Sequence, residues 1–255
     1  LIASLIANVR YNLNRKVTRI RIFEVGSVYL RNQLVVDGAL TVAGYEQPKR
    51  IAAMAYGPVA DEQWGQATRN VDYFDIKADL EALFAPYDLQ FVKFSYPALH
   101  PGRSAQIVLD GKVIGFIGEL HPHLQQKYDL PLAPIMFELD AVALQSRSLP
   151  AYKEISKFPA MVRDIALVVK QTVSMQDLIR AFKEEKQKNN ACQILQAVVL
   201  FDEYRGKGLE HDEKSLAFRF TLQDTQTTLQ DEVVETAMAA FIAAASKNFG
   251  AKLRT

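Results

Sequence analysis

The alternation of apolar and polar residues divides the first part of the chain into strand-like and helix-like segments. Alternating patterns at 19–25, 50–56, 89–95 and 135–139 predict strands, and apolar residues at helical spacing predict helices at 74–84 and about 122–128. In the segment 106–117, Asp110-Gly111 separates two apolar runs, which predicts a hairpin with a type I′ turn. These elements indicate a largely antiparallel α+β domain.

The first residues already carry an amphipathic helix pattern, over 1–11, with no N-cap residue before it. The sequence also begins with Leu1 rather than Met. We therefore expect it to be a piece of a longer protein, with its first domain incomplete at the N-terminus.

A polar, proline-containing segment at 146–153 lacks periodicity, so we place a boundary there, between a domain at 1–150 and a domain at 151–255. In the second domain, Ser174 and Thr228 are expected to open helices, and Gly250 to end the second one. Four strands complete it, at 164–169, 194–204, 215–222 and 251–254. The order β-α-β-β-α-β predicts a ferredoxin-like fold with both helices on one face of the sheet.

Period-two counting then assigns side chains to the other, open face of this sheet. Ile165, Leu167 and Val169 are expected to face the helices. On the next strand, Ala197, Val199 and Phe201 are expected inward, with Val198 and Leu200 outward. The open face is predicted to collect Ala166, Asp202, Tyr204, Ser215, Ala217 and Arg219.

The chemistry of this open face suits an unstacked base. Tyr204 can stack on a base, a contact of roughly 1–3 kcal/mol, and Asp202 can accept hydrogen bonds from a guanine edge. Ser215 can bond to either kind of edge atom, and the small Ala166 and Ala217 allow a ring to approach. An ordinary solvated sheet face would show the same spacing, so the pattern alone leaves both interpretations open.

Composition limits the partners and the location of the protein. The net charge is +1 and both predicted domains are nearly neutral, so the basic footprint of many nucleic-acid-binding proteins is absent. The single cysteine, Cys192, excludes an internal disulfide and is expected in the core. No apolar run approaches the ~20 residues of a membrane span, and no signal peptide is visible, so a cytoplasmic protein is expected. His121 and His123 lack partners at metal-ligand spacing and are expected to start a helix.

Several motifs resemble one family. Residues 155–169, Leu200-Phe-Asp-Glu-Tyr-Arg-Gly-Lys-Gly208 with 214–218, and 222–232 are similar to the C-terminal ferredoxin-fold anticodon-binding domain of bacterial phenylalanyl-tRNA synthetase β subunits. Upstream, Arg21-Ile-Phe-Glu-Val-Gly26, 98–105 and 114–122 resemble the catalytic-like, class II synthetase-type module of the same subunit. The resemblance covers essentially the whole chain, in the same order.

The resemblance implies that the second domain binds the anticodon of tRNA-Phe and that the first is an interface for the catalytic α subunit, in an (αβ)₂ heterotetramer. By position, the family's anticodon-contacting Asp, Tyr and Ser fall on Asp202, Tyr204 and Ser215. ATP and Mg²⁺ would serve the holoenzyme, and this chain is expected to bind no cofactor and no metal.

Catalysis by this chain is not expected. Arg21 echoes the arginine that meets the ATP α-phosphate in class II synthetases, but 136–144 contains neither a glycine nor an arginine where the second nucleotide motif should stand. Triphosphate charge would remain uncompensated. Two other functions stay open: an amino-acid-binding regulatory module with a ferredoxin-like fold, and an autonomous ligase.

Overall fold

The computed structural model describes residues 1–145, 152 and 155–254. The chain divides into two compact units, Leu1–Leu149 and Pro150–Thr255. The predicted boundary segment, 146–153, falls outside the described residues except for Tyr152.

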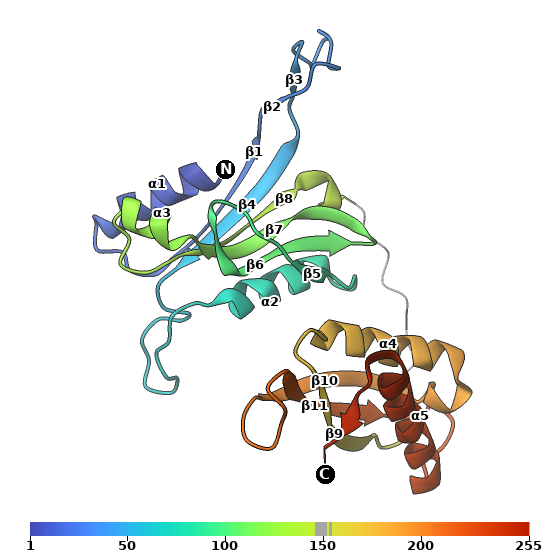
Figure 1. The fold of residues 1–255 in the computed structure, drawn as a ribbon. Helices are drawn as coiled ribbons and strands as arrows, with labels where there is room; N and C mark the ends of the chain where they lie inside the picture. Colours follow the sequence, from blue (N-terminus) through green and yellow to red (C-terminus); the bar gives the residue numbers. More distant parts are fainter. Residues whose placement is uncertain (146–151, 153–154, 255) are drawn as a thin grey trace. The chain divides into compact units, whose positions relative to one another are not determined.

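The first unit is built on a six-stranded antiparallel sheet with the strand order β1-β4-β8-β7-β6-β5 (Figure 1). Its strands are β1 (Ile20–Ser27), β4 (Lys49–Tyr56), β5 (Gln90–Lys93), β6 (Leu99–Leu109), β7 (Lys112–Leu120) and β8 (Ile135–Asp140). At the β6–β7 turn, Asp110 and Gly111 both have positive φ, 50° and 77°, as the predicted type I′ turn requires.

Helices cover both faces of this sheet, so the unit has two cores. α1 (Ile2–Leu13) and α3 (Pro122–Lys127) lie on one side and α2 (Tyr73–Phe84) on the other (Figure 1). α1 buries Leu5, Ile6 and Val9, and α2 buries Ile76, Leu80 and Phe84. Alternating strand residues supply the opposite wall of each core, since successive side chains point to opposite faces.

Sequence patterns did not predict the hairpin of β2 (Leu30–Arg31) and β3 (Tyr45–Glu46) that extends beyond the end of the main sheet (Figure 1). Its strands are too short for a periodic signal. The segment from His100 to Arg103 lies inside β6, at a register irregularity.

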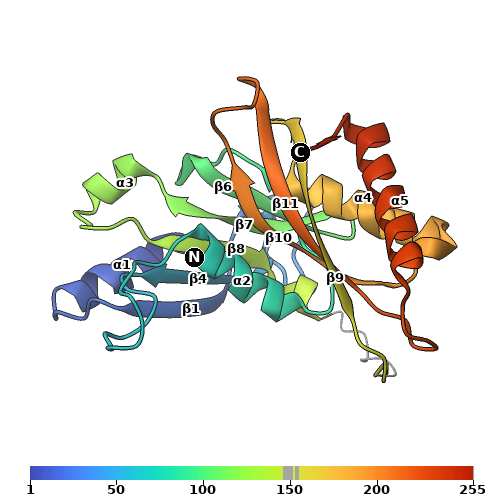
Figure 2. The ribbon, with the colours of Figure 1, turned by 90° about the horizontal axis from the view of Figure 1, so that it is seen from below.

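The second unit has the predicted β-α-β-β-α-β order. Its elements are β9 (Met161–Lys170), α4 (Met175–Lys188), β10 (Leu195–Tyr204), β11 (Glu213–Leu222), α5 (Asp231–Phe249) and β12 (Lys252–Leu253). The sheet is antiparallel, in the order β10-β11-β9-β12, and both helices cover one side of it (Figure 2). The ferredoxin-like prediction is confirmed.

Four phenylalanines hold the helices to this sheet. Phe182 of α4 lies edge-on to Phe218 and Phe220 of β11 and to Phe241 of α5, with ring centroids 5.0–5.9 Å apart. Phe241 also contacts Phe220, at 5.3 Å. All four are fully buried. Edge-to-face aromatic contacts of this kind add to the burial of large apolar surfaces.

The predicted helix ends are mostly correct. Ser174 forms a capping box with Asp177 at the start of α4, and Gly250 ends α5 in the left-handed region at φ 64°. The prediction that Thr228 opens α5 is wrong, because Gln230 is the N-cap and makes no side-chain cap hydrogen bond. Among the described residues, no helix is both long and apolar enough to cross a bilayer.

Candidate nucleic-acid interface

The uncovered face of the four-stranded sheet is organised in rows across β11. Ser215 lies opposite Tyr204 on β10 and Val168 on β9. One step along the strand, Ala217 lies opposite Asp202 and Ala166. The structure therefore brings five of the six predicted residues into two adjacent rows, and the sixth, Arg219, belongs to the next row.

The predicted facing of the first half of β10 is wrong. Val198 and Leu200 pack against the core, whereas Val199 and Phe201 are 55% and 52% exposed. The register shifts between Leu200 and Asp202, where Phe201 is the additional residue of a β-bulge. This bulge reverses the alternation, so Asp202 and Tyr204 reach the open face although the strand before them is oriented opposite to the prediction.

The Tyr204 ring is held by contacts at its hydroxyl and on its face. The hydroxyl donates to the Lys207 carbonyl oxygen at 3.2 Å. Gly206 lies so close that a Cβ there would be 2.7 Å from the same hydroxyl. The Arg254 guanidinium carbon lies 4.6 Å from the ring centroid. The ring is thus oriented by the β10–β11 connection and by the end of the chain.

The expectation that Ser215 presents an open hydroxyl is wrong. Ser215 belongs to the open face by register, yet it is only 2% exposed. Arg254, which the alternation of β10 and β11 does not mark, also reaches over this face toward Tyr204. The β9–β12 pairing continues by one residue beyond Leu253, and this puts Arg254 beside Ala166 of the open face.

Charges on the open face differ in how far they are compensated. Arg219 makes a bidentate ion pair with Asp164 across the strands, at 2.9 and 2.7 Å, and lies over the Phe201 ring. The hydrogen bonds from Arg219 hold the pKa of Asp164 below its ordinary value. The Asp202 side chain is exposed and makes no hydrogen bond or ion pair to any described residue, so its carboxylate can accept from a ligand.

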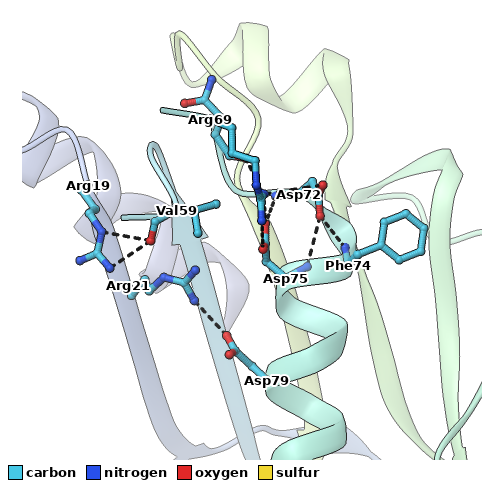
Figure 3. Close-up of polar contacts among 9 residues, drawn as sticks. Arg19, Arg21, Val59, Arg69, Asp72, Phe74, Asp75 and Asp79 are labelled. Atoms are coloured by element: carbon cyan, nitrogen blue, oxygen red, sulfur yellow. Dashed lines mark hydrogen bonds and ion pairs between the residues drawn. The ribbon is translucent and has the colours of Figure 1, made fainter. Parts of the chain in front are cut away.

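In the first unit, the arginine that echoes a nucleotide-binding arginine is engaged by an acid. Arg21 Nη1 lies 2.9 Å from Asp79 Oδ2 (Figure 3). Nearby, Arg69 makes a bidentate pair with Asp75, at 2.7 and 2.6 Å, and Asp72 caps α2. The hydrogen bonds from Arg69 lower the pKa of Asp75 to about 2. These contacts fix the start of α2.

The remaining candidate residues, His121, His123 and Cys192, take part in a helix cap or in the core. His121 Nδ1 accepts from the His123 backbone N–H and so caps α3, as expected of a helix start. Cys192 is fully buried, and burial raises the pKa of its thiol to about 11. Within the part of the chain that the structure describes, no three His, Cys, Asp or Glu side chains are grouped to hold a metal ion.

A hollow of about 540 Å³ lies between α4 and the edge strand β10. Its polar lining residues are Lys183, Lys186, Gln187, Gln193 and Gln196. Lys186 Nζ already donates to the Leu195 carbonyl oxygen at 2.5 Å. The polar side chains of the lining are lysines and glutamines, with no carboxylate among them.

Comparison with known proteins assigns both units. Residues 1–141 match the family described as the phenylalanyl tRNA synthetase beta chain CLM domain. The chain belongs to the phenylalanyl-tRNA synthetase beta chain family. Residues 156–254 match the ferredoxin-fold anticodon binding domain, in agreement with the topology of the second unit.

Members of this beta chain family are similar along the whole chain. The chain is 54% identical to the phenylalanine–tRNA ligase beta subunit of Burkholderia pseudomallei (strain 1710b), 53% to that of Ralstonia nicotianae and 47% to that of Dechloromonas aromatica. Each match covers 100% of this chain but only 31–32% of the relative. The chain thus spans about a third of the length of these beta subunits.

Proposed function

We propose that this chain is a non-catalytic part of a cytoplasmic phenylalanine–tRNA ligase. The second unit contacts the anticodon of tRNA-Phe, and the first is an assembly surface for the catalytic α subunit in an (αβ)₂ heterotetramer. Ligase activity, with its ATP and Mg²⁺, belongs to the assembled enzyme.

The observation that carries the anticodon proposal is that Asp202 and Tyr204 lie next to each other on an uncovered sheet face. The bulge at Phe201 turns both side chains outward, and Ala217 and Ala166 extend the row of Asp202 across two neighbouring strands. A carboxylate without a partner beside an oriented aromatic ring provides an acceptor for a base edge and a stacking surface for its plane.

The assembly proposal rests on family membership and on the apolar edge of the six-stranded sheet. β1 is an edge strand, and its Phe23 and Val25 are 74% and 57% exposed. Exposed aromatic and branched side chains in succession along an edge favour contact with a partner protein. The α subunit is the partner that membership in the beta chain family supports.

The absence of catalysis in this chain is supported by the state of Arg21. Its guanidinium is paired with Asp79, and no arginine or glycine occurs in 136–144. An ATP triphosphate placed against this sheet would meet Arg21, whose charge Asp79 already neutralises, and residues 136–144 would supply no second arginine.

The alternative of an amino-acid-binding module is not favoured. The hollow beside α4 lies where a helix–strand edge site would be expected, but no carboxylate lines it to pair with an ammonium group. A thermal shift produced by phenylalanine but not by tRNA-Phe would reverse this preference.

Tyr204→Ala in the assembled αβ enzyme tests the anticodon proposal. Loss of one stacked base, roughly 1–3 kcal/mol, predicts a decrease in kcat/KM for tRNA-Phe of about 5- to 150-fold, with ATP–pyrophosphate exchange unchanged. Lys247→Ala is the matched control, because Lys247 is an exposed residue of the last turn of α5 on the covered side of the sheet. Charging kinetics equal to wild type in the Tyr204 variant would reject the proposal.

A further inference from the structure

Arg254 crosses the open face of the second unit. Its backbone N–H donates to the Ala166 carbonyl oxygen at 2.8 Å, which continues the pairing of β12 with β9. Its guanidinium lies over the ring of Tyr204, which is on β10. The strand order β10-β11-β9-β12 puts these two residues at opposite edges of the sheet.

The two side chains therefore meet above the central strands. Three inter-strand spacings of about 4.8 Å separate β12 from β10, or roughly 14 Å. A contact of 4.6 Å across that span requires both Tyr204 and Arg254 to lie along the sheet surface toward each other. Small residues beneath them, Ala166, Ala217 and Ser215, leave the room for this arrangement.

Little besides the ring holds the Arg254 side chain in place. No hydrogen bond or ion pair from its guanidinium to another described residue accompanies the cation–π contact. Arg219 on the same face contrasts with it, because Arg219 is fixed by the bidentate pair with Asp164. Arg254 is thus a cation without a carboxylate partner among the described residues, placed against the ring of Tyr204.

We propose that Arg254 forms the second wall of a base-binding slot whose first wall is Tyr204. Two stacking contacts of about 3.5 Å require walls roughly 7 Å apart, so the guanidinium must withdraw by about 2–3 Å to admit a base. The entering base exchanges the cation–π contact for stacking on both sides, since bases stack on guanidinium planes as well as on aromatic rings.

This inference rests on the proposed anticodon function and adds a residue to it. Arg254→Ala removes the plane and the charge, whereas Arg254→Lys keeps the charge and removes the plane. In the assembled αβ enzyme, we expect kcat/KM for tRNA-Phe to fall about 10-fold for the alanine variant and at least 3-fold for the lysine variant. Lys247→Ala, which removes one positive charge from the covered side, should leave it unchanged.

A second experiment uses tRNA-Phe transcripts that lack the base at one anticodon position at a time. It distinguishes stacking on a particular base from a general contribution of the two side chains to tRNA binding. The penalties of Tyr204→Ala and Arg254→Ala should both disappear with the same abasic transcript, because no base is then left to stack. Wild-type kinetics for the alanine variant, full restoration by lysine, or a penalty that persists with all three abasic transcripts would overturn the slot.

The two proposals fail in different ways. If Tyr204→Ala has no effect on charging, the anticodon face itself is rejected. If Tyr204→Ala impairs charging and Arg254→Ala does not, only the second wall is rejected. Thermal unfolding of both variants, followed by circular dichroism, should match wild type, because neither side chain belongs to the core of the second unit.

Discussion

Tyr204 is oriented by neighbouring residues of its own chain. Its hydroxyl is bonded to Lys207, its ring lies under Arg254, and Gly206 closes the space beside the hydroxyl. The glycine is required for space, since its φ lies outside the left-handed region. Orientation before binding lowers the entropy lost when a base stacks.

Gly206→Ala should therefore displace the Tyr204 ring while leaving the tyrosine itself unchanged. A Cβ at 2.7 Å from the Tyr204 hydroxyl forces the ring to move. We expect kcat/KM for tRNA-Phe in the assembled enzyme to fall about 10-fold, part of the ~1–3 kcal/mol of one stacked base. Gly65→Ala is the control, because a Cβ there meets nothing within 4 Å. Equal kinetics for the two variants would show that the ring tolerates displacement.

Asp75 gives a pH-dependent contribution to the stability of the first unit. Folding lowers its pKa from about 3.8 to about 2, chiefly through Arg69. The stabilisation is present above about pH 4 and is lost as the pH falls toward 2, because the unfolded chain binds more protons in that range. Since Arg69 is half-exposed, solvent screening reduces the effect to about 1 kcal/mol.

Asp75→Asn should lower the free energy of unfolding by about 1 kcal/mol at pH 6, and the difference from wild type should vanish near pH 2. Asparagine keeps an acceptor for the Asp72 N–H, so the change isolates the charge. Urea unfolding followed by circular dichroism between pH 2 and pH 6 measures it. A difference that stays constant with pH would contradict the assignment to the Arg69 pair.

At the scale of elements, the two helices of the second unit begin differently. α4 starts with a complete capping box, in which Ser174 accepts from the Asp177 N–H at 3.1 Å. α5 starts at Gln230, in extended backbone but without a side-chain cap. The acidic residues of its first turn, Asp231 and Glu232, provide only the favourable interaction with the helix dipole.

Opposite effects are expected from substitutions at these two caps. Ser174→Ala should lower the free energy of unfolding by about 1 kcal/mol, because the N–H groups of the first turn lose an acceptor. Gln230→Ser should raise it by about 0.5–1 kcal/mol by supplying one. Urea midpoints of the two variants test both, and a Gln230 variant less stable than wild type would show that the amide side chain has another role.

At the scale of the whole molecule, the chain is close to electrically neutral, with a net charge of +1. On the open face, Arg219 and Lys170 are paired with carboxylates, and Arg254 is the cation there whose described contact is a ring. Few phosphates can therefore be neutralised by this face, so in the proposed assembly we expect most of the electrostatic affinity for tRNA to come from other parts.

A weak salt dependence is expected for the chain alone. With one or two phosphate contacts, its affinity for an anticodon stem-loop should fall only a few-fold between 50 and 200 mM salt. Fluorescence anisotropy with a labelled stem-loop measures this slope, and the assembled αβ enzyme provides the comparison. A fall of a hundredfold or more for the chain alone would mean that further cations contact the RNA.

The sequence by itself determined the order and type of nearly all the longer elements, because local periodicity and turn chemistry are written in neighbouring residues. Asp110-Gly111 specified its turn, Ser174 its helix start and Gly250 its helix end. The ferredoxin-like topology followed from that order. Short elements, such as the β2–β3 hairpin, have too few residues for a periodic pattern.

Only the tertiary structure decided which side chains share the open face and which are accessible there. The bulge at Phe201 reversed the alternation of β10, and a bulge depends on the pairing of two strands rather than on either alone. Ser215 lies on the open face by register yet is buried, and Arg254 is close to Tyr204 only because β12 pairs with β9. Contacts between residues far apart in the chain are set by strand pairing, and a one-residue shift in that pairing moves every later side chain to the other face.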